Sequence, residues 1–347
     1  MSYKSLSDCL KCSIGLIFLL FYHTGSAQSG ELDRYIDQQS KNYAGNMVVM
    51  AWKGDSLLYQ KATGEYNINT QESVGEAGAW FTAALVMHYV DQGKISLDDP
   101  VARYLPIFEK YAKGYLTIRH CLENTTGLEG DKAGLTRMIK KSRFESLEEE
   151  VDSYASKREI LNNPGIDYNY NQIGLSIAGR VLEVVGKKSF DRLMTEKIFR
   201  PLGMRKSTFT AEYSVSPFSG AKTSPADYIR FMNMLMQGGT LNGKTVLTPE
   251  SVQVILSLWA EKSKMVYSPE FAAGFSPSAG SWIITKNREG KPTVFTSPAQ
   301  QGIWPWLDQC RNYSAVIFIK GPAKTPTRPL FEAIKPMLDA LAGGNCE

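Results

Sequence analysis

Residues 80–106 read WFTAALVMHYVDQGKISLDDPVARYLP, and the first half of this stretch repeats apolar side chains at helical spacing. Apolar residues that recur every three or four positions form one face of an α-helix. In this stretch they are Trp80, Phe81, Ala84, Leu85, Met87 and Val90. Gly93 follows as a C-terminal stop signal. The pattern predicts a buried helix over residues 78–92, with a second, short helix that begins at Asp98-Asp99-Pro100.

Strand signals lie toward both ends of the chain, and helical signals lie between them. The predicted strands are NMVVMAW (46–52) and SLLYQKA (56–62), joined by a tight turn, and then 281–285, 293–296 and 313–320. The predicted amphipathic helices are 172–185, 190–199, 225–237 and, after the last strand, 330–341. We therefore expect an α/β (α+β) fold. Its sheet domain would comprise residues 28–75 and 240–347, and a mainly helical domain of residues 76–239 would be inserted between them.

The composition is that of a globular chain and excludes several classes of function. The 347 residues are 43% hydrophobic and 21% charged, which is ample for a sizeable core. The formal net charge is +4 and the basic residues are scattered, so no nucleic-acid partner is expected. His88 and His120 have no carboxylate or cysteine cluster at ligand spacing around them. No metal site and no cofactor is expected.

The N-terminus has the pattern of a secretion signal. Lys4 and Lys11 form a positive region, residues 13–22 (SIGLIFLLFY) form an apolar run, and Gly25-Ser26-Ala27 offers small residues for cleavage. We expect residues 1–27 to be removed, leaving a periplasmic or secreted protein with no membrane span. A retained anchor is the alternative.

Three cysteines follow the leader: Cys121, Cys310 and Cys346. In an oxidising compartment they allow one disulfide and one free thiol. The sequence leaves the pairing open and favours buried single thiols.

Four stretches resemble the serine β-lactamase and penicillin-binding-protein-like hydrolases, in particular the class C β-lactamase and esterase branch. Residues 80–106 are similar to that family's nucleophile helix and its continuation. LTIRHCLENTTGL (116–128) resembles the signature ITIRHLLxHTSGL, IFRPLGM (198–204) resembles IFxPLGM, and LNGKTVLTPESV (241–252) has the family pattern. The resemblance covers roughly residues 44–320. It implies the β-lactamase/transpeptidase-like fold, an antiparallel sheet flanked by helices with an all-helical insertion.

The nucleophile motif departs from the family pattern. The family places a serine three residues before a lysine, so both lie on one helix face and the amine can take the hydroxyl proton. At that register this chain has Glu76 and Ala79. The exchange shifts the site by about two charges toward negative, and a β-lactam or a peptide C-terminus brings its own carboxylate. Since like charges in a partly dry cleft cost on the order of a kcal/mol or more, acyl transfer by the usual route is not expected.

Two further family elements contribute candidate site residues. Aligning the pattern PGxxFxYSN on residues 164–172 keeps the tyrosine as Tyr170 and replaces the asparagine by Gln172. Tyr170 remains a candidate general acid or base. The family's Lys/His-x-Gly strand falls at Ser297-Pro298-Ala299, which carries no cation to hold a substrate carboxylate. The expected ligand-binding residues are Gln172, Ser297, Ala299, Gln300 and Trp304.

We interpret the chain as a secreted, non-catalytic relative that uses its cleft to bind a small molecule, a peptide, a cell-wall fragment or a protein. The alternative is an enzyme with rebuilt chemistry, in which Glu76 is a general base and Tyr170 an acid. A structural role for Glu76 also explains its presence, because the helix dipole stabilises an acidic residue in the first turn. Ser73 is not expected to replace the nucleophile, since no lysine follows it at three-residue spacing. The ligand and the oligomeric state are left open.

Overall fold

The computed structural model describes residues 29–130, 144–257, 259–300, 302–319, 326–344 and 346. The predicted leader, residues 1–27, lies outside this part of the chain, as do residues 131–143. Across the described residues, no helix combines the length and the apolar character needed to cross a bilayer.

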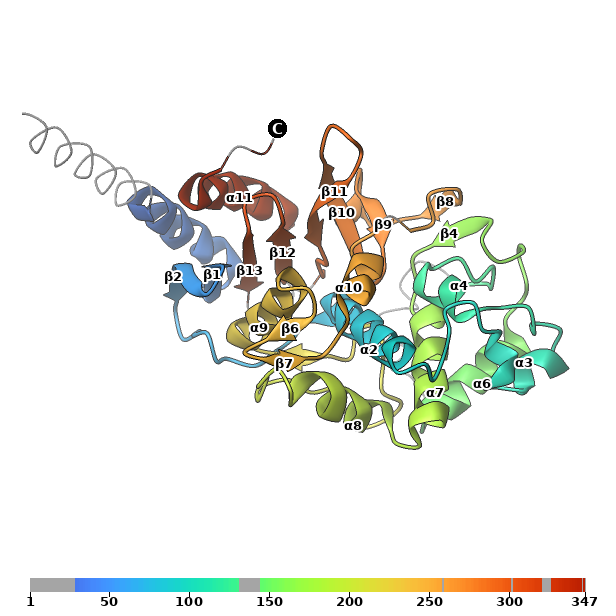
Figure 1. Cartoon of the computed structure of the whole chain (residues 1–347). Helices are drawn as coiled ribbons and strands as arrows, with labels where there is room; N and C mark the ends of the chain where they lie inside the picture. Colours follow the sequence, from blue (N-terminus) through green and yellow to red (C-terminus); the bar gives the residue numbers. More distant parts are fainter. Residues whose placement is uncertain are drawn as a thin grey trace, which may run out of the picture.

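A seven-stranded sheet is built from both ends of the sequence (Figure 1). Its strand order is β2-β1-β13-β12-β11-β10-β9, and every neighbouring pair is antiparallel. The strands are β1 (Met47–Lys53), β2 (Ser56–Thr63), β9 (Ser276–Ser278), β10 (Ser281–Lys286), β11 (Pro292–Thr296), β12 (Trp304–Asp308) and β13 (Tyr313–Ile319). The pairing of β1 with β13 joins the two chain ends and runs from Met47 opposite Ile319 to Lys53 opposite Tyr313. The predicted antiparallel sheet is confirmed.

Most helices lie in the middle of the chain, and two lie near its ends. They are α2 (Ala79–Asp91), α3 (Ile107–Lys110), α4 (Ile118–Leu122), α6 (Leu147–Lys157), α7 (Ile173–Gly186), α8 (Phe190–Met194), α9 (Pro225–Met236), α10 (Pro249–Ile255) and α11 (Arg328–Ala342), with a further helix over residues 29–40. Short ribbons pair β3 (Glu72–Ser73) with β5 (Lys222–Thr223), β4 (Asp167–Asn169) with β8 (Lys264–Tyr267), and β6 (Thr240–Leu241) with β7 (Lys244–Thr245).

Local sequence signals explain where several helices begin. The Ser224 side chain accepts a hydrogen bond from the Asp227 N–H, and Pro225 occupies the first turn, so α9 starts with a hydroxyl cap and a preset backbone angle. Thr248 caps α10 in the same way. The predicted helix 190–199 is divided, because α8 ends at Met194 and the next residues, Thr195–Phe199, form a π-helical turn.

Strand β1 shows how both faces of the sheet are covered. Met47, Val49 and Ala51 belong to one buried cluster, with residues of α11 and of the helix over 29–40. Val48 and Met50 belong to the other, with α2, α7 and α9. A strand covered on both faces reads as a continuous apolar run, which is the pattern of residues 46–52. The helical part therefore shares one continuous core with a face of the sheet.

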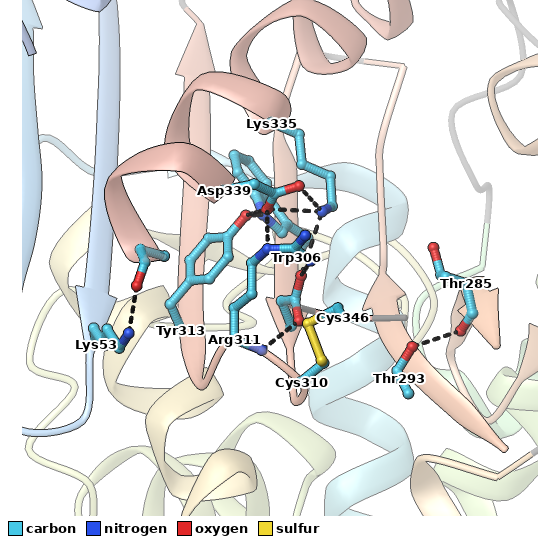
Figure 2. A network of polar contacts seen from close by, with 12 residues as sticks. Lys53, Thr285, Thr293, Trp306, Cys310, Arg311, Tyr313, Lys335, Asp339 and Cys346 are labelled. Atoms are coloured by element: carbon cyan, nitrogen blue, oxygen red, sulfur yellow. Dashed lines mark hydrogen bonds and ion pairs between the residues drawn. A yellow bond between two sulfur atoms is a disulfide. The ribbon is translucent and has the colours of Figure 1, made fainter. Parts of the chain in front are cut away.

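The cysteine pairing is settled at the C-terminal end. Cys310 and Cys346 form a disulfide with a Cα–Cα distance of 5.8 Å, shown in Figure 2, and Cys121 is a buried free thiol. The expectation of single thiols at all three positions is wrong. The pairing depends on α11, which returns the chain end to the β12–β13 turn, and no local sequence signal reports that return.

A charge network beside this disulfide fastens α11 to the same turn (Figure 2). Asp308 is fully buried and pairs with Arg311 at 3.2 Å and Lys335 at 3.4 Å. The Tyr313 hydroxyl donates to Asp339 at 2.6 Å, and Lys335 also reaches Asp339 at 2.8 Å. Two cations thus face two carboxylates, so these buried charges are compensated within the network.

Candidate functional site at the start of helix α2

Glu76 and Ala79 lie at the N-terminal end of α2. A 3₁₀ turn, Gly75–Gly78, leads directly into the helix, and the Ala79 N–H donates to the Glu76 carbonyl. Glu76 is half-buried, whereas Ala79 is 2% exposed. The carboxylate therefore sits where the unpaired N–H groups of a helix start create positive potential.

The segment that follows β11 lies opposite this helix start. The Gln300 N–H points at Oε2 of Glu76 at 3.4 Å, a long hydrogen bond. Ser297 is buried, and its hydroxyl donates to the Gly280 carbonyl at 3.0 Å. Gly280 packs so closely on α2 that an added Cβ would lie 2.5 Å from the Ala79 carbonyl oxygen. The structure thus brings the start of α2, with Glu76, close to the segment that carries Ser297 and Gln300.

Tyr228 of α9 contacts the turn that carries Glu76, and the sequence did not predict this role. Its hydroxyl donates to the Ala77 carbonyl at 2.8 Å, one residue from Glu76. Burial raises the pKa of Tyr228 well above its usual value, so it stays protonated as a donor. Tyr228 lies among the apolar residues of α9, where nothing in the sequence distinguishes it from other core aromatics.

Tyr170 lies at the junction between the helical part and the sheet. Its ring centroid is 5.2 Å from that of Phe218 and 5.3 Å from that of Trp282. Its N–H donates to the Tyr267 carbonyl at 3.1 Å, which continues the β4–β8 ribbon. Trp282 lies on β10, two residues after Gly280, which packs on the start of α2. Tyr170 therefore contacts the strand whose first end adjoins the start of α2.

Among the described residues, the Gln172 side chain hydrogen-bonds to α6 and not to the residues around Glu76. Its Nε2 donates to the Tyr154 hydroxyl at 3.1 Å, and that hydroxyl donates to Glu150 at 2.5 Å. Glu150 also accepts from the Ser214 hydroxyl at 2.5 Å. Gln172 therefore has a structural partner on α6, and its extra methylene relative to asparagine is used in an interhelical contact.

Two of the expected ligand-binding residues contribute no side chain here. Ala299 is 1% exposed, and its N–H closes a turn by donating to the Ile303 carbonyl at 2.9 Å. Trp304 is 1% exposed and stacks on Phe331 of α11 with ring centroids 4.6 Å apart. The expectation that Trp304 lines the cleft is wrong, because its position on β12 directs the ring to the α11 face of the sheet. Within the described ranges, no group of three or more His, Cys, Asp or Glu residues is arranged to hold a metal ion.

The profile of the Beta-lactamase family matches residues 32–334. The chain belongs to the serine β-lactamase and penicillin-binding-protein-like family. A solved structure of a putative β-lactamase from Bacteroides dorei is 26% identical, with a TM-score of 0.79 and coverage of 89% of this chain and 98% of that one.

Curated members of this family also match the chain. The putative penicillin-binding protein PbpX of Bacillus subtilis is 23% identical over 68% of this chain and 59% of that protein. The D-alanyl-D-alanine-carboxypeptidase/endopeptidase AmpH of Escherichia coli is 20% identical over 76% of this chain and 74% of that protein. The chain spans 26%, 57% and 59% of the length of the first three curated relatives that it matches.

Proposed function

We propose that this protein is a non-catalytic member of its family that binds, rather than cleaves, a peptide, cell-wall fragment or protein at the start of α2. The observation that carries the proposal is the pairing of Glu76 with the Gln300 N–H next to a buried Ala79. A backbone N–H beside a helix N-terminus is suited to stabilise an anion that develops during acyl transfer. Here the Glu76 carboxylate occupies that position, and position 79 has no amine to act as a base.

The same charge selects among ligands. The Glu76 carboxylate already compensates the positive potential at the start of α2. A free carboxylate on a ligand would therefore be repelled by Glu76 at this point. A neutral or positively charged group would be attracted instead. We therefore propose ligands that present an amine, an amide or a hydroxyl at this point.

The disulfide supports a location outside the reducing cytosol. Disulfides persist mainly in oxidising compartments, and Cys310–Cys346 closes a loop with a sequence separation of 36 residues. Together with the leader pattern of residues 1–27, this favours a periplasmic or secreted protein. Mass spectrometry of the mature protein from cell fractions tests this. An unprocessed, cytosolic chain with free thiols would contradict it.

A turnover assay on the purified protein tests the proposal. Nitrocefin and p-nitrophenyl acetate should be hydrolysed no faster by the wild type than by the buffer background. Glu76→Ala should leave that result unchanged, with exposed Glu65→Ala as the matched control. Turnover lost only in Glu76→Ala would replace the proposal by an enzyme that uses Glu76 and Tyr170, and turnover retained in Glu76→Ala would point to another nucleophile.

A further inference from the structure

A hollow lies between α9 and the end of β1. It encloses about 630 Å³, within the range of small-ligand sites. Its floor is a stripe along one face of α9, and Met50 and Trp52 of β1 form the opposite wall. The stripe consists of Ala226, Ile229, Arg230, Asn233 and Gln237. None of these residues takes part in the site around Glu76. We refer to this hollow as the α9 groove; Figure 1 shows α9 below the β1 end of the sheet.

Asn233 offers an amide donor to the α9 groove. It is 8% exposed, and its Oδ1 accepts from the Ser314 hydroxyl at 2.6 Å. Within the described part of the chain, the Nδ2 group makes no hydrogen bond, while the residue lines the groove. The amide donor is therefore open to the groove and free to bind a ligand acceptor. The groove therefore has a polar group placed for a carbonyl oxygen.

The two ends of the groove carry opposite charges. Arg230 is exposed, and its guanidinium takes part in no ion pair or hydrogen bond among the described residues. The nearby carboxylate of Asp227 already accepts from the Lys206 N–H at 2.6 Å and the Ser207 hydroxyl at 2.9 Å. At the other end, Asp55 accepts from Gln237 Nε2 at 3.1 Å.

The spacing of these charges matches a short peptide. Arg230 and Gln237, the residue directly after α9, are seven residues apart, which at 1.5 Å per residue is about 10 Å along the helix axis. An extended peptide spans about 3.3–3.6 Å per residue, so three residues cover about the same distance. Trp52 and Ile229 provide apolar surface between the two ends.

We propose that the α9 groove binds a peptide of about three residues with free termini and an apolar central side chain. Its carboxylate pairs with Arg230, its ammonium with Asp55, and a central carbonyl accepts from Asn233 Nδ2. The central side chain packs against Trp52. This site is separate from the one around Glu76 and does not depend on the function proposed there.

Calorimetric titration with alanyl-leucyl-alanine and its capped forms tests the proposal. The free peptide should bind saturably, and C-terminal amidation or N-terminal acetylation should each weaken binding by about fivefold, the value of one exposed charge pair. Arg230→Gln should weaken the free peptide to the same extent and leave the amidated peptide unaffected. Asp55→Asn should weaken binding of the free peptide to the same extent and leave binding of the acetylated peptide unaffected. Arg205→Gln, which removes an exposed cation outside the groove, is the matched control and should change nothing.

Asn233→Asp adds a variant that tests the central contact. It keeps an acceptor for Ser314 and replaces the Nδ2 donor by a charged oxygen, so it should weaken all peptides by about tenfold. The urea midpoint of each variant verifies folding. Absence of saturable binding up to about 10 mM, equal binding of the free and doubly capped peptides, or an equal loss in Arg205→Gln would each overturn the proposal.

Discussion

The Gln300 N–H lies 3.4 Å from Oε2 of Glu76, across 224 residues of sequence. This contact joins the end of β11 to the start of α2, and Gly280 closes the same junction by packing on the Ala79 carbonyl. The result is a preformed donor at a helix N-terminus that faces a resident carboxylate. An anionic intermediate at this point would have to compete with the Glu76 carboxylate for the Gln300 N–H.

Restoring the family's pair of residues should restore chemistry. The double variant Glu76→Ser, Ala79→Lys places a hydroxyl and an amine three residues apart at the start of α2, on one side of the helix. We expect hydrolysis of p-nitrophenyl esters about 10²-fold or more above the wild type, the usual contribution of a positioned base. Steady-state absorbance measures it.

The control for this prediction keeps the size of the side chain and removes the amine. Glu76→Ser, Ala79→Met should remain inactive, as should each single substitution, because nucleophile and base act as a unit. Equal activity in the lysine and methionine variants would show that the amine does not serve as the base, and that the assigned register is wrong.

Much of the fold was predictable because its signals are local. Residues 46–52 and 313–320 are apolar runs of strand length, and α2 follows a helical repeat that ends at Gly93. The four stretches that resemble the family implied the overall topology, which hydrophobic periodicity alone does not specify. The pairing of β1 with β13 is an example, since it links residues more than 250 positions apart.

The site was predictable only in part, because side-chain direction depends on register. The structure places the Gln300 N–H beside Glu76 and the Ser297 hydroxyl beside Gly280, at positions that the family motifs indicate. The Trp304 ring points to the α11 face of the sheet. Strand β12 is covered by apolar layers on both faces, so its sequence does not alternate between apolar and polar residues and does not show which face each side chain occupies. Tyr228 supports the site from within an apolar helix, where its role depends on a contact with Ala77 151 residues away.

Gly280 should be far less tolerant of substitution than a glycine of the same backbone type in open space. Gly280 has φ +65° and Gly290 has φ +79°, so alanine is strained at both. Only at Gly280 does the new Cβ meet other atoms, 2.5 Å from the Ala79 carbonyl oxygen; at Gly290 nothing lies within 4 Å. Gly280→Ala should lower the free energy of unfolding by about 2 kcal/mol more than Gly290→Ala. Urea denaturation measures both, and equal losses would show that the β9–β10 turn does not press on α2.

The disulfide should contribute substantially to stability. Its sequence separation of 36 residues corresponds to roughly 3–4 kcal/mol of lost unfolded-state entropy. The Cys310→Ser, Cys346→Ser double variant should therefore unfold at a lower urea concentration. Dithiothreitol should shift the wild type toward the variant and leave the variant where it is. An effect of the reductant on the variant would mean that Cys121 or another thiol is responsible.

His88 should make the protein less stable as the pH falls below neutrality. Burial lowers the pKa of His88, assisted by Lys197 and Lys94, although the Val246 carbonyl and Asp91 oppose the shift. The unfolded chain, with a pKa of about 6.5, takes up the proton first on acidification. Its contribution to stability is therefore complete above about pH 6.5 and declines as the pH falls toward the lower pKa of the folded state.

His88→Asn isolates this effect. The His88 ring has Nδ1 2.8 Å from the Val246 carbonyl, and the asparagine amide offers a donor at a similar distance from the backbone without a titrating proton. The free energy of unfolding, measured from about pH 7.5 to 5, should fall less steeply in the variant than in the wild type. Half-buried carboxyls such as Glu123 and Glu183, whose pKa values desolvation raises, change stability in the opposite sense. They are common to both proteins and cancel in the difference. Identical slopes would mean that His88 is as easily protonated in the folded chain as in the unfolded one.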